Sequence, residues 1–428
     1  MKVVIIGAGS AFGSRLSIDI LSREPIHDAT IALCDINAEK LETVCKFVQS
    51  AIDHHKLPAK VVASTDRRAL LPGADYVVIA VSIGGPAYYD TPFDWEMDIP
   101  AKYGVVQTVA DTVGPGGIFR ALRTGPAMLE FVRDINDLCP GAMILNYTNP
   151  MAMLTWVLSE KSVGPVVGLC HGVQGTSQKM AKYIGAPYGE IGFWCAGINH
   201  MAWFLEFTHN GENAYPRLFQ AMENPAIYDQ DPTRFDILRR FNYFCTESSR
   251  HALEYMPYFR HDTARVERFR NITRGVKGRR QTWYEDMGVK AEHADSIQLI
   301  RSHEYASGIM EAMATNVPMR FNGNVMNRGL ITSLLQGCCV EVACLTDNRG
   351  VHPCHAGALP AQCAALCRTN VNVQELTVKA ILEKDKDAAY HAILLDPLSA
   401  AVLSFDRAQA MFEELWKAEG NLLRYYES

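Results

Sequence analysis

Two short stretches near the middle of the chain place a thiol and imidazoles directly after apolar runs. In "VVGLCHGVQG" the run ends at Cys170 and His171, and in "CAGINHMAWF" a later run ends at Asn199 and His200. A cysteine thiolate and a neutral imidazole are good ligands for a borderline divalent metal. Because Cys170 and His200 end separate predicted strands, their side chains can converge on one ion.

These residue types also have an ordinary structural explanation. A single cysteine at a strand end is usually a small buried hydrophobic residue, and a single histidine is usually a hydrogen-bonded part of the core. His171 follows Cys170 directly, so its side chain can point elsewhere. The residues by themselves therefore leave two alternatives, a metal site or two unrelated core positions.

A third group of polar side chains lies in "TESSRHALEYMPYF", where Glu247, His251 and Tyr255 are spaced by four. If this segment is helical, the three side chains share one face. A phenol on a polar face is a candidate for acid–base chemistry. The alternative, which these residues alone favour, is an exposed helix side that carries an amphipathic tyrosine.

Alternating strands and helices in the first half of the chain must position these groups. The predicted strands are short apolar runs, namely "KVVIIGAG", "TIALCDI", "KVVAST", "DYVVIAVS", "AMILNYT" and "VVGLC". Segments with helical spacing separate most of them. This alternation predicts an α/β fold in which a Rossmann-type, doubly wound parallel sheet is covered by helices on both faces.

The pattern changes near residue 190. The segment "EIGFWCAGINHMAWFLEFTHNGE" predicts a strand, a polar corner and a second strand, and the remainder is mostly helical with a late strand in "QGCCVEVACLTD". We therefore predict a dinucleotide-binding domain over residues 1–190 and a mostly helical α+β domain over residues 191–428. Because no linker rich in Pro, Gly or Ser separates them, we expect close packing with the active site between them.

The first strand leads into a glycine-rich turn, "GAGSAFG", which contains Gly7, Gly9, Ser10 and Gly13. Gly7 allows a tight turn, and Gly9 lets the backbone approach a pyrophosphate at the helix N-terminus. Asp35 ends the second strand, where an acid holds a ribose hydroxyl and favours NAD over NADP. The alternative is a glycine-rich turn that binds no ligand.

Polar side chains also follow the later strands of the predicted sheet. Asp111 lies in "ADTVGPGG", and Asn146 and Asn149 lie in "NYTNP". Ligands of such sheets bind beyond the carboxyl ends of the strands, so these residues are candidates for the site, with Asn146 beside the cofactor. Either asparagine is also explained by turn formation before Pro150.

The overall composition excludes several classes of partner. The chain has 428 residues, 48% of them hydrophobic, a net charge of -6 and no block of Lys and Arg, so we expect neither nucleic acid nor a membrane as partner. Its twelve cysteines, in a large chain without a secretory leader, predict reduced thiols and a cytoplasmic protein. No run approaches the roughly 18 apolar residues of a membrane span.

These pieces together resemble glycoside hydrolase family 4, and within it the α-galactosidase branch. The matching segments cover residue 3 to about residue 400 in order: "GAGSAFG", "QTVADTVGPGGIFRALRT", "LNYTNPMAM", "GLCHGVQGT", "CAGINHMAW", "FCTESSRHALEYMPYF", "HEYASGIM" and "LLQGCCVEVACLTD". The resemblance implies a fold like that of lactate and malate dehydrogenases, bound NAD⁺ and a divalent metal, usually Mn²⁺. The predicted substrate is an α-galactoside, and we expect a homodimer or homotetramer.

The resemblance also implies an unusual route of hydrolysis. NAD⁺ oxidises the sugar at C3, a base removes the C2 proton, the C1 oxygen leaves by elimination, water adds, and the hydride returns. The family's metal ligands match Cys170 and His200, and its tyrosine base matches Tyr255. Its substrate-binding asparagine matches Asn149, and Glu247 falls where relatives place an acidic residue near the metal.

The general acid differs from the pattern of some relatives, which have Asp directly after the ligand Cys. His171 occupies that place here and titrates near neutrality. Asp111 is the other candidate, and the sequence does not choose between them.

Three other functions compete with α-galactoside hydrolysis. A 2-hydroxy acid dehydrogenase shares the dinucleotide signature, but it does not need Cys170 as a metal ligand. A protein that only senses NAD or binds sugar does not need the cluster of thiol, imidazole and carboxylate. An α-glucuronidase or α-galacturonidase of the same family needs a cation for the C6 carboxylate, and Arg250, Arg260 and Arg301 are the candidates.

Overall fold

The computed structural model describes residues 1–275 and 286–427, and its centre is one sheet of twelve strands. The strands are β1 Lys2–Ile6, β2 Thr30–Cys34, β3 Lys60–Ser64, β4 Tyr76–Ile79, β5 Met143–Asn146, β6 Val166–Leu169, β7 Ile191–Ile198, β8 Met201–His209, β9 Glu212–Asn213, β10 Met319–Met326, β11 Cys339–Asp347 and β12 Gly350–Pro353.

The longer helices surround this sheet, and short helices connect them. The helices are α1 Ala11–Leu21, α2 Ala38–His54, α3 Arg67–Leu70, α4 Phe93–Lys102, α5 Gly114–Leu138, α6 Met151–Lys161, α7 Gly172–Tyr183, α8 Tyr215–Ala221, α9 Pro225–Tyr228, α10 Pro232–Phe241, α11 Ser249–Tyr255, α12 Thr263–Arg274, α14 Ala306–Thr315, α15 Ala361–Glu383, α16 Lys386–Leu395, α17 Pro397–Ala400 and α18 Phe405–Glu419.

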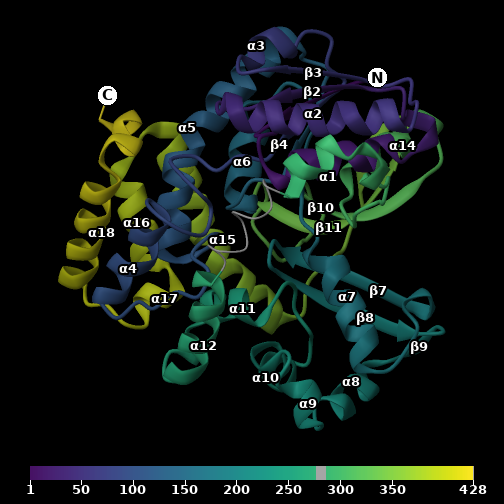
Figure 1. The fold of residues 1–428 in the computed structure, drawn as a ribbon. Coiled ribbons are helices and arrows are strands. Elements are labelled where there is room, and N and C mark those ends of the chain that lie inside the picture. The colour runs from purple at the N-terminus through teal and green to yellow at the C-terminus, as the bar shows by residue number, and fades with distance from the viewer. Residues whose placement is uncertain (276–285, 428) are drawn as a thin grey trace.

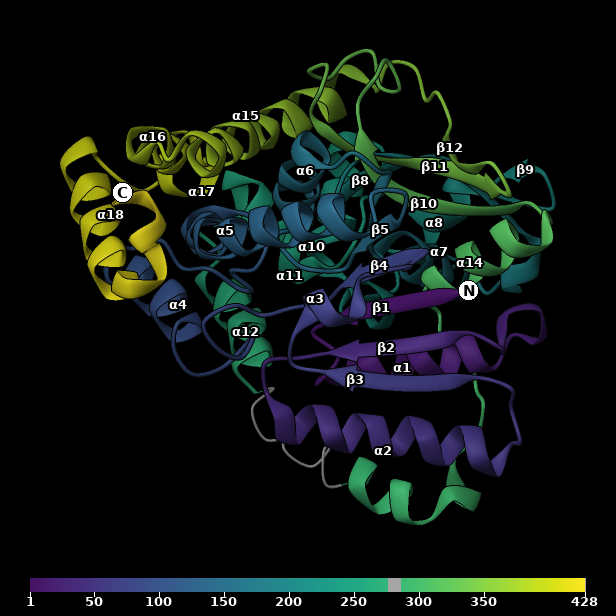
Figure 2. The same ribbon diagram turned by 90° about the horizontal axis from the view of Figure 1, so that it is seen from above.

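Six parallel strands form the first half of the sheet, in the order β3-β2-β1-β4-β5-β6. Helices α1 and α2 cover one face, and α5 and α6 cover the other (Figure 2). Strands β1, β4 and β5 are almost entirely buried, because a parallel sheet covered on both faces has no solvent side. This strand order is that of dinucleotide-binding folds, so the predicted fold class is confirmed.

Strands from the second half of the chain extend the same sheet. Strand β10 pairs antiparallel with β6, and β11, β7, β8 and β9 follow in that order. The sequence predicts β7, β8 and β11 but misses β10, whose apolar run is interrupted by Asn322, Gly323 and Asn324. The sheet therefore crosses residue 190 without a break, and the division into two domains there stays a prediction.

The C-terminal helices pack beside the N-terminal half (Figure 1). Helix α18 contacts α4, where the Tyr103 hydroxyl donates to Oε2 of Glu414 at 2.9 Å. The Tyr426 hydroxyl donates to the carbonyl oxygen of Leu122 at 2.7 Å. One large hydrophobic cluster includes residues of both halves, so the two halves share a core. Across the described residues, no helix combines the length and apolarity needed to cross a membrane.

Candidate active site

The candidate site lies at the carboxyl ends of the parallel strands. Ile6 of β1, Ile79 of β4, Asn146 of β5 and Gly168 of β6 are paired in a row, so the carboxyl ends of these strands lie side by side. The glycine-rich turn follows β1 at one end of this row, and Cys170 follows β6 at the other end. Three strand spacings, about 14 Å, separate the two ends.

The turn after β1 has the close contacts that its glycines predict. Gly7 has a φ of 90°, and an added Cβ would lie 2.2 Å from the carbonyl oxygen of Ala80. A Cβ on Gly13 would lie 2.2 Å from the carbonyl oxygen of Ala8. Ser10 precedes α1, and its hydroxyl donates to the carbonyl oxygen of Gly7 at 3.0 Å. The backbone here has no room for side chains, as a nucleotide-binding turn requires.

Asp35 closes the other side of this turn. The amide of Gly9 donates to Oδ2 of Asp35 at 2.8 Å, which holds the carboxylate beside the turn. Asn146 is arranged differently, because its side chain is buried and turned into its own loop. Its Nδ2 donates to the carbonyl oxygen of Thr148 and to Oγ1 of Thr155, and its Oδ1 accepts from the Thr148 amide. This geometry favours the turn-forming alternative for Asn146.

Cys170 and His200 meet at the other end of the row. Sγ of Cys170 lies 3.4 Å from Nε2 of His200, and the Thr112 hydroxyl lies 3.1 Å from Nδ1 of the same ring. His200 occupies the corner between β7 and β8 with a φ of 60°. Burial and the neighbouring His251 lower the pKa of His200 to about 4, so its imidazole is neutral, as a metal ligand must be.

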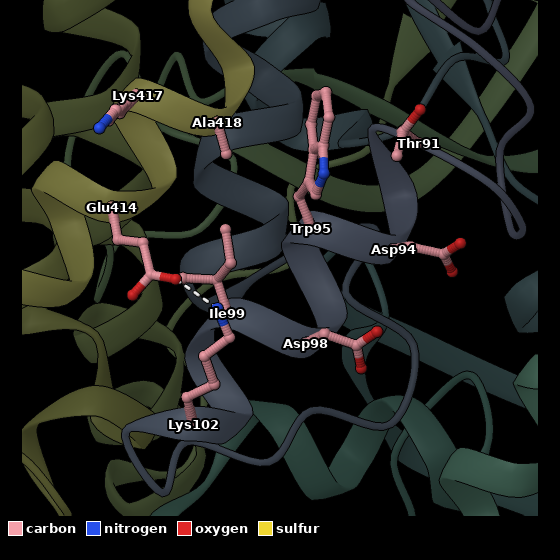
Figure 3. Close-up of a pocket in the computed structure, with 9 residues that line it drawn as sticks. All are labelled: Thr91, Asp94, Trp95, Asp98, Ile99, Lys102, Glu414, Lys417 and Ala418. Atoms are coloured by element: carbon pink, nitrogen blue, oxygen red, sulfur yellow. Dashed lines mark hydrogen bonds and ion pairs between the residues drawn. The ribbon is translucent and has the colours of Figure 1, made fainter.

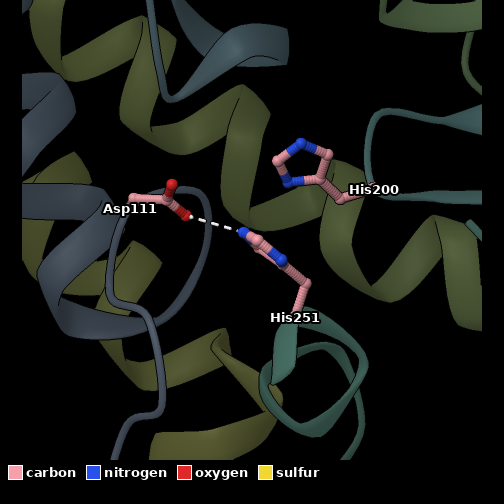
Figure 4. Close-up of side chains that lie close together, drawn as sticks. All are labelled: Asp111, His200 and His251. Carbon is pink, nitrogen blue, oxygen red and sulfur yellow. Dashed lines mark hydrogen bonds and ion pairs between the residues drawn. The ribbon is translucent and has the colours of Figure 1, made fainter. Parts of the chain in front are cut away.

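Asp111 and His251 form the centre of a buried chain of charged groups (Figure 4). Nε2 of His251 lies 3.2 Å from Oδ1 of Asp111. On the other side of the ring, Nδ1 of His251 lies 2.5 Å from Oε2 of Glu247. Burial lowers the pKa of His251, but the two carboxylates outweigh burial and raise it to about 10. The imidazole is therefore a cation between two anions.

Asp111 accepts hydrogen bonds from several directions. Its Oδ1 accepts from the Thr112 hydroxyl at 2.7 Å, and its Oδ2 accepts from the Tyr88 hydroxyl at 3.0 Å and from Nδ2 of Asn149 at 3.2 Å. Burial raises the pKa of Asp111, but His251, with smaller contributions from His200 and Arg120, outweighs burial and holds the pKa well below its usual range. Asp111 is therefore a charged acceptor that carries no proton near neutral pH.

His171 is exposed to solvent and lies outside this buried cluster. Its side chain is 63% exposed, and its Nδ1 lies 3.5 Å from Oε1 of Glu304. The hydrogen bond and charge of Glu304 raise the pKa of His171 above its ordinary value, although burial opposes this effect. His171 is thus able to carry a proton in contact with solvent.

Tyr255 is buried, and its hydroxyl donates to the carbonyl oxygen of Asn199 at 2.8 Å. Burial, with Asp111 as the next cause, raises the pKa of this phenol well above its usual value. Helix α11 begins at Ser249, so Glu247 lies before the helix and not on the helical face expected from its spacing. His251 and Tyr255 remain on that helix.

The structure thus brings Cys170, His200, Asp111 and Glu247 together, and it adds His251, for which the sequence suggested only a helical face. Ligand atoms of Asp111, His200 and His251 all lie within 4.8 Å of one another. A set of thiol, imidazole and carboxylate donors fits a borderline divalent cation. Tyr88 and Thr112 were also missed, because no local pattern shows that they will touch Asp111 or His200.

A separate hollow of about 460 Å³ lies between α4 and α18 (Figure 3). Its walls are formed by Thr91, Asp94, Trp95, Asp98, Ile99, Lys102, Glu414, Lys417 and Ala418. None of these residues was predicted as a site residue, and the buried Glu96 on the same helix pairs with Arg120 and Arg123 instead. The thiol, imidazoles and carboxylates predicted from the sequence thus lie at the strand ends and outside this hollow.

Comparison with known proteins shows the family of the chain. Residues 2–186 match the family described as "Family 4 glycosyl hydrolase", and residues 195–399 match "Family 4 glycosyl hydrolase C-terminal domain". The chain belongs to glycosyl hydrolase family 4. The resemblance inferred from sequence is confirmed, and so is the prediction of a glycosidase.

Family 4 relatives match along nearly the whole chain. An α-galactosidase of Bacillus subtilis is 38% identical over 434 residues, with 100% of both chains covered. An α-galactosidase of Rhizobium meliloti is 36% identical and covers 99% of this chain and 89% of its own length. A Thermotoga maritima 6-phospho-β-glucosidase, solved with manganese, NAD⁺ and glucose-6-phosphate, has a TM-score of 0.80 at 21% identity, covering 100% of this chain and 99% of that one. At this identity the last match bears on the fold.

Replacement of Gly9 by alanine tests the cofactor end. The added Cβ would lie 2.7 Å from Cγ of Asp35, so the carboxylate must move. We expect Gly9→Ala to weaken NAD⁺ binding at least tenfold in a fluorescence titration, while Gly141→Ala, where a Cβ meets open space, leaves it unchanged. Equal NAD⁺ affinity in Gly9→Ala and the wild type would remove this turn from the cofactor site.

Removal of the thiol or imidazole tests the metal end. We expect Cys170→Ser and His200→Ala each to weaken Mn²⁺ binding at least tenfold, with NAD⁺ binding retained, because the glycine turn lies about 14 Å away. Free Mn²⁺ measured by electron paramagnetic resonance reports the binding. Cys45→Ser removes a partly buried thiol from α2 and serves as the control. A variant that binds Mn²⁺ like the wild type would exclude that residue as a ligand.

Proposed function

We propose that this family 4 glycosidase hydrolyses α-galactosides with the help of NAD⁺ and a divalent cation such as Mn²⁺. Two relatives that match it over nearly their full lengths are named α-galactosidases. A solved structure with the same fold holds manganese, NAD⁺ and a sugar phosphate. These comparisons support the substrate class and both cofactors.

The observation that carries the proposal is the arrangement of two sites along one row of strand ends. The glycine turn with Asp35 lies at one end, and the cluster of Cys170, His200 and Asp111 lies at the other. A plain 2-hydroxy acid dehydrogenase needs the first site but not a buried thiol–imidazole pair. A protein that only binds NAD or sugar needs neither the pair nor the charged chain beside it.

Gly7, Gly9, Ser10, Gly13 and Asp35 would hold NAD⁺, with Asn146 contributing at most through its loop. Cys170 and His200 would hold the cation. The Asp111 carboxylate lies close enough to join them, and the protonated His251 would orient that carboxylate. When bound, NAD⁺ supplies reversible hydride removal at C3 of the sugar, and the cation supplies Lewis-acid polarisation of the sugar oxygens.

The chain's own residues handle the protons. Tyr255 is our candidate base for the C2 proton; its phenol is buried beside the cluster, where a cation lowers a raised pKa. Asn149, with its amide on Asp111, and Glu247 are candidates for binding the sugar hydroxyls.

His171 is the better candidate for protonating the leaving group. Asp111 already accepts from Thr112, Tyr88 and Asn149, so it has no proton to give. His171 follows the candidate ligand Cys170 directly, its side chain is 63% exposed beside Glu304, and it is able to carry a proton. We therefore assign His171 as general acid and Asp111 as a charged member of the cluster.

The three arginines considered for a uronide substrate are engaged elsewhere. Arg260 donates to the carbonyl oxygens of Val106 and Leu253, at 2.6 and 2.8 Å. Arg301 donates to the carbonyl oxygen of Ser22, and Arg250 donates to the hydroxyl of Thr273. These contacts give no support to an α-glucuronide or α-galacturonide through the three arginines.

Isotope exchange tests the proposed route. With p-nitrophenyl α-galactoside, NAD⁺ and Mn²⁺ in D₂O, we expect galactose with deuterium at C2 and no net NADH, because the C2 proton leaves and a solvent proton returns. NMR of the product measures the label. Tyr255→Phe should slow turnover about 10²–10⁴-fold, as loss of a general base does. Unlabelled product from an active enzyme, or full activity after removal of NAD⁺, would contradict the route.

The choice of leaving group tests His171. We expect His171→Ala to lose little activity toward p-nitrophenyl α-galactoside, because nitrophenolate leaves without a proton. The same variant should lose about 10²-fold or more toward melibiose, whose sugar leaving group needs one. Asp111→Asn should impair both substrates. Equal losses of His171→Ala on both substrates would argue against its role as the acid.

A further inference from the structure

A buried carboxylate outside the reacting cluster holds the loop that carries Asp111. Glu254 lies on α11, fully buried, and its Oε1 accepts from three successive backbone amides. The distances are 2.6 Å to Thr108, 2.7 Å to Val109 and 3.0 Å to Ala110. Three amides aimed at one oxygen fix the path of the backbone directly before Asp111.

The conformation fixed there is one that a residue with a side chain rarely adopts. Ala110 has a φ of 57°, in the left-handed region that favours glycine. Such a conformation persists only when the surroundings hold it. Since Ala110 precedes Asp111, a change of its φ would redirect the carboxylate away from His251 and Thr112.

Two further contacts fasten the same loop to the same helix. The Thr108 hydroxyl donates to the carbonyl oxygen of Arg250 at 2.7 Å. Arg260 bridges the carbonyl oxygens of Val106 in the loop and Leu253 in the helix. The loop and α11 are therefore fastened to each other. His251 lies on the same helix, one turn before Glu254, so these contacts also fix its position relative to the loop.

We propose that Glu254 is the positioning residue of this enzyme: by holding the amides of residues 108–110, it aims Asp111 at His251 and at the cation site. Glu254 touches neither the cluster's reacting atoms nor the glycine turn, so it acts only through Asp111 and α11. The inference rests on the proposed function insofar as Asp111, oriented by His251, completes the cation site.

The test compares Glu254→Ala and Glu254→Gln with Asp134→Asn in the full-length protein. Asp134 is a buried carboxylate that binds Arg67 and Arg68 away from the cluster, so it controls for loss of a buried acid. The measurements are Mn²⁺ affinity by electron paramagnetic resonance, NAD⁺ affinity by fluorescence, melting temperature, and kcat and KM for p-nitrophenyl α-galactoside.

We expect Glu254→Ala to weaken Mn²⁺ binding about 10–100-fold, as loss of a residue that orients metal ligands does. Its kcat should fall more than its KM changes, and its NAD⁺ affinity should stay within threefold. In Glu254→Gln an amide oxygen still accepts the three N–H groups without the charge, so we expect a smaller loss, at least threefold. Asp134→Asn should lower the melting temperature but leave Mn²⁺ affinity and kcat unchanged.

Mn²⁺ affinity and kcat within twofold of the wild type in the folded Glu254 variants would overturn the proposal. If Glu254→Ala does not fold, Glu254→Gln decides by the same threshold. A wild-type protein that binds no Mn²⁺ and hydrolyses without NAD⁺ would instead refute the proposed function, and this result is visible before any variant is compared.

Discussion

The ion pair between Asp111 and His251 is the interaction on which the candidate site depends. Charged groups removed from water are stable only when each has a partner, and here each does. Glu247 pairs with the other nitrogen of the imidazole, and Asp111 accepts further hydrogen bonds from Thr112, Tyr88 and Asn149. Displacing Asp111, His251 or Glu247 would leave a buried charge unpaired. The ion pair therefore holds the loop that carries Asp111 against helix α11.

The mixed sheet lets the thiol meet this pair. Strand β6 ends at Cys170, and β10 and β11 lie between β6 and β7. Because β7 then turns back at His200, the corner returns the imidazole to within 3.4 Å of the sulfur. A conventional end to the parallel sheet at β6 would leave Cys170 without that neighbour. The added antiparallel strands are therefore part of the site's construction.

Helix α11 joins the two loops that carry the charged groups. His251 contacts Asp111, Glu254 binds the amides before it, and Tyr255 binds the carbonyl oxygen of Asn199, next to His200. Two residues of the site, Ala110 and His200, have a positive φ. The short helix α11 contacts Ala110 directly through Glu254, and it contacts Asn199, the neighbour of His200, through Tyr255. This bracing keeps the groups in place before substrate binds, which is how a preorganised site lowers a reaction barrier.

The sequence offered Cys170 and His200 as candidate ligands, but only the family resemblance favoured a metal site over two core positions. By itself it determined the strands of the parallel sheet and the glycine turn with Asp35. These features depend on local periodicity and on backbone shapes that only glycine adopts, and both are visible within a few residues. Only the tertiary structure decided that His251 pairs with Asp111, 140 residues earlier, that Asn146 turns inward, and that β10 joins the sheet. Those outcomes depend on which distant segments become neighbours, because a buried charge or an interrupted strand is stabilised by its partner and not by its own sequence.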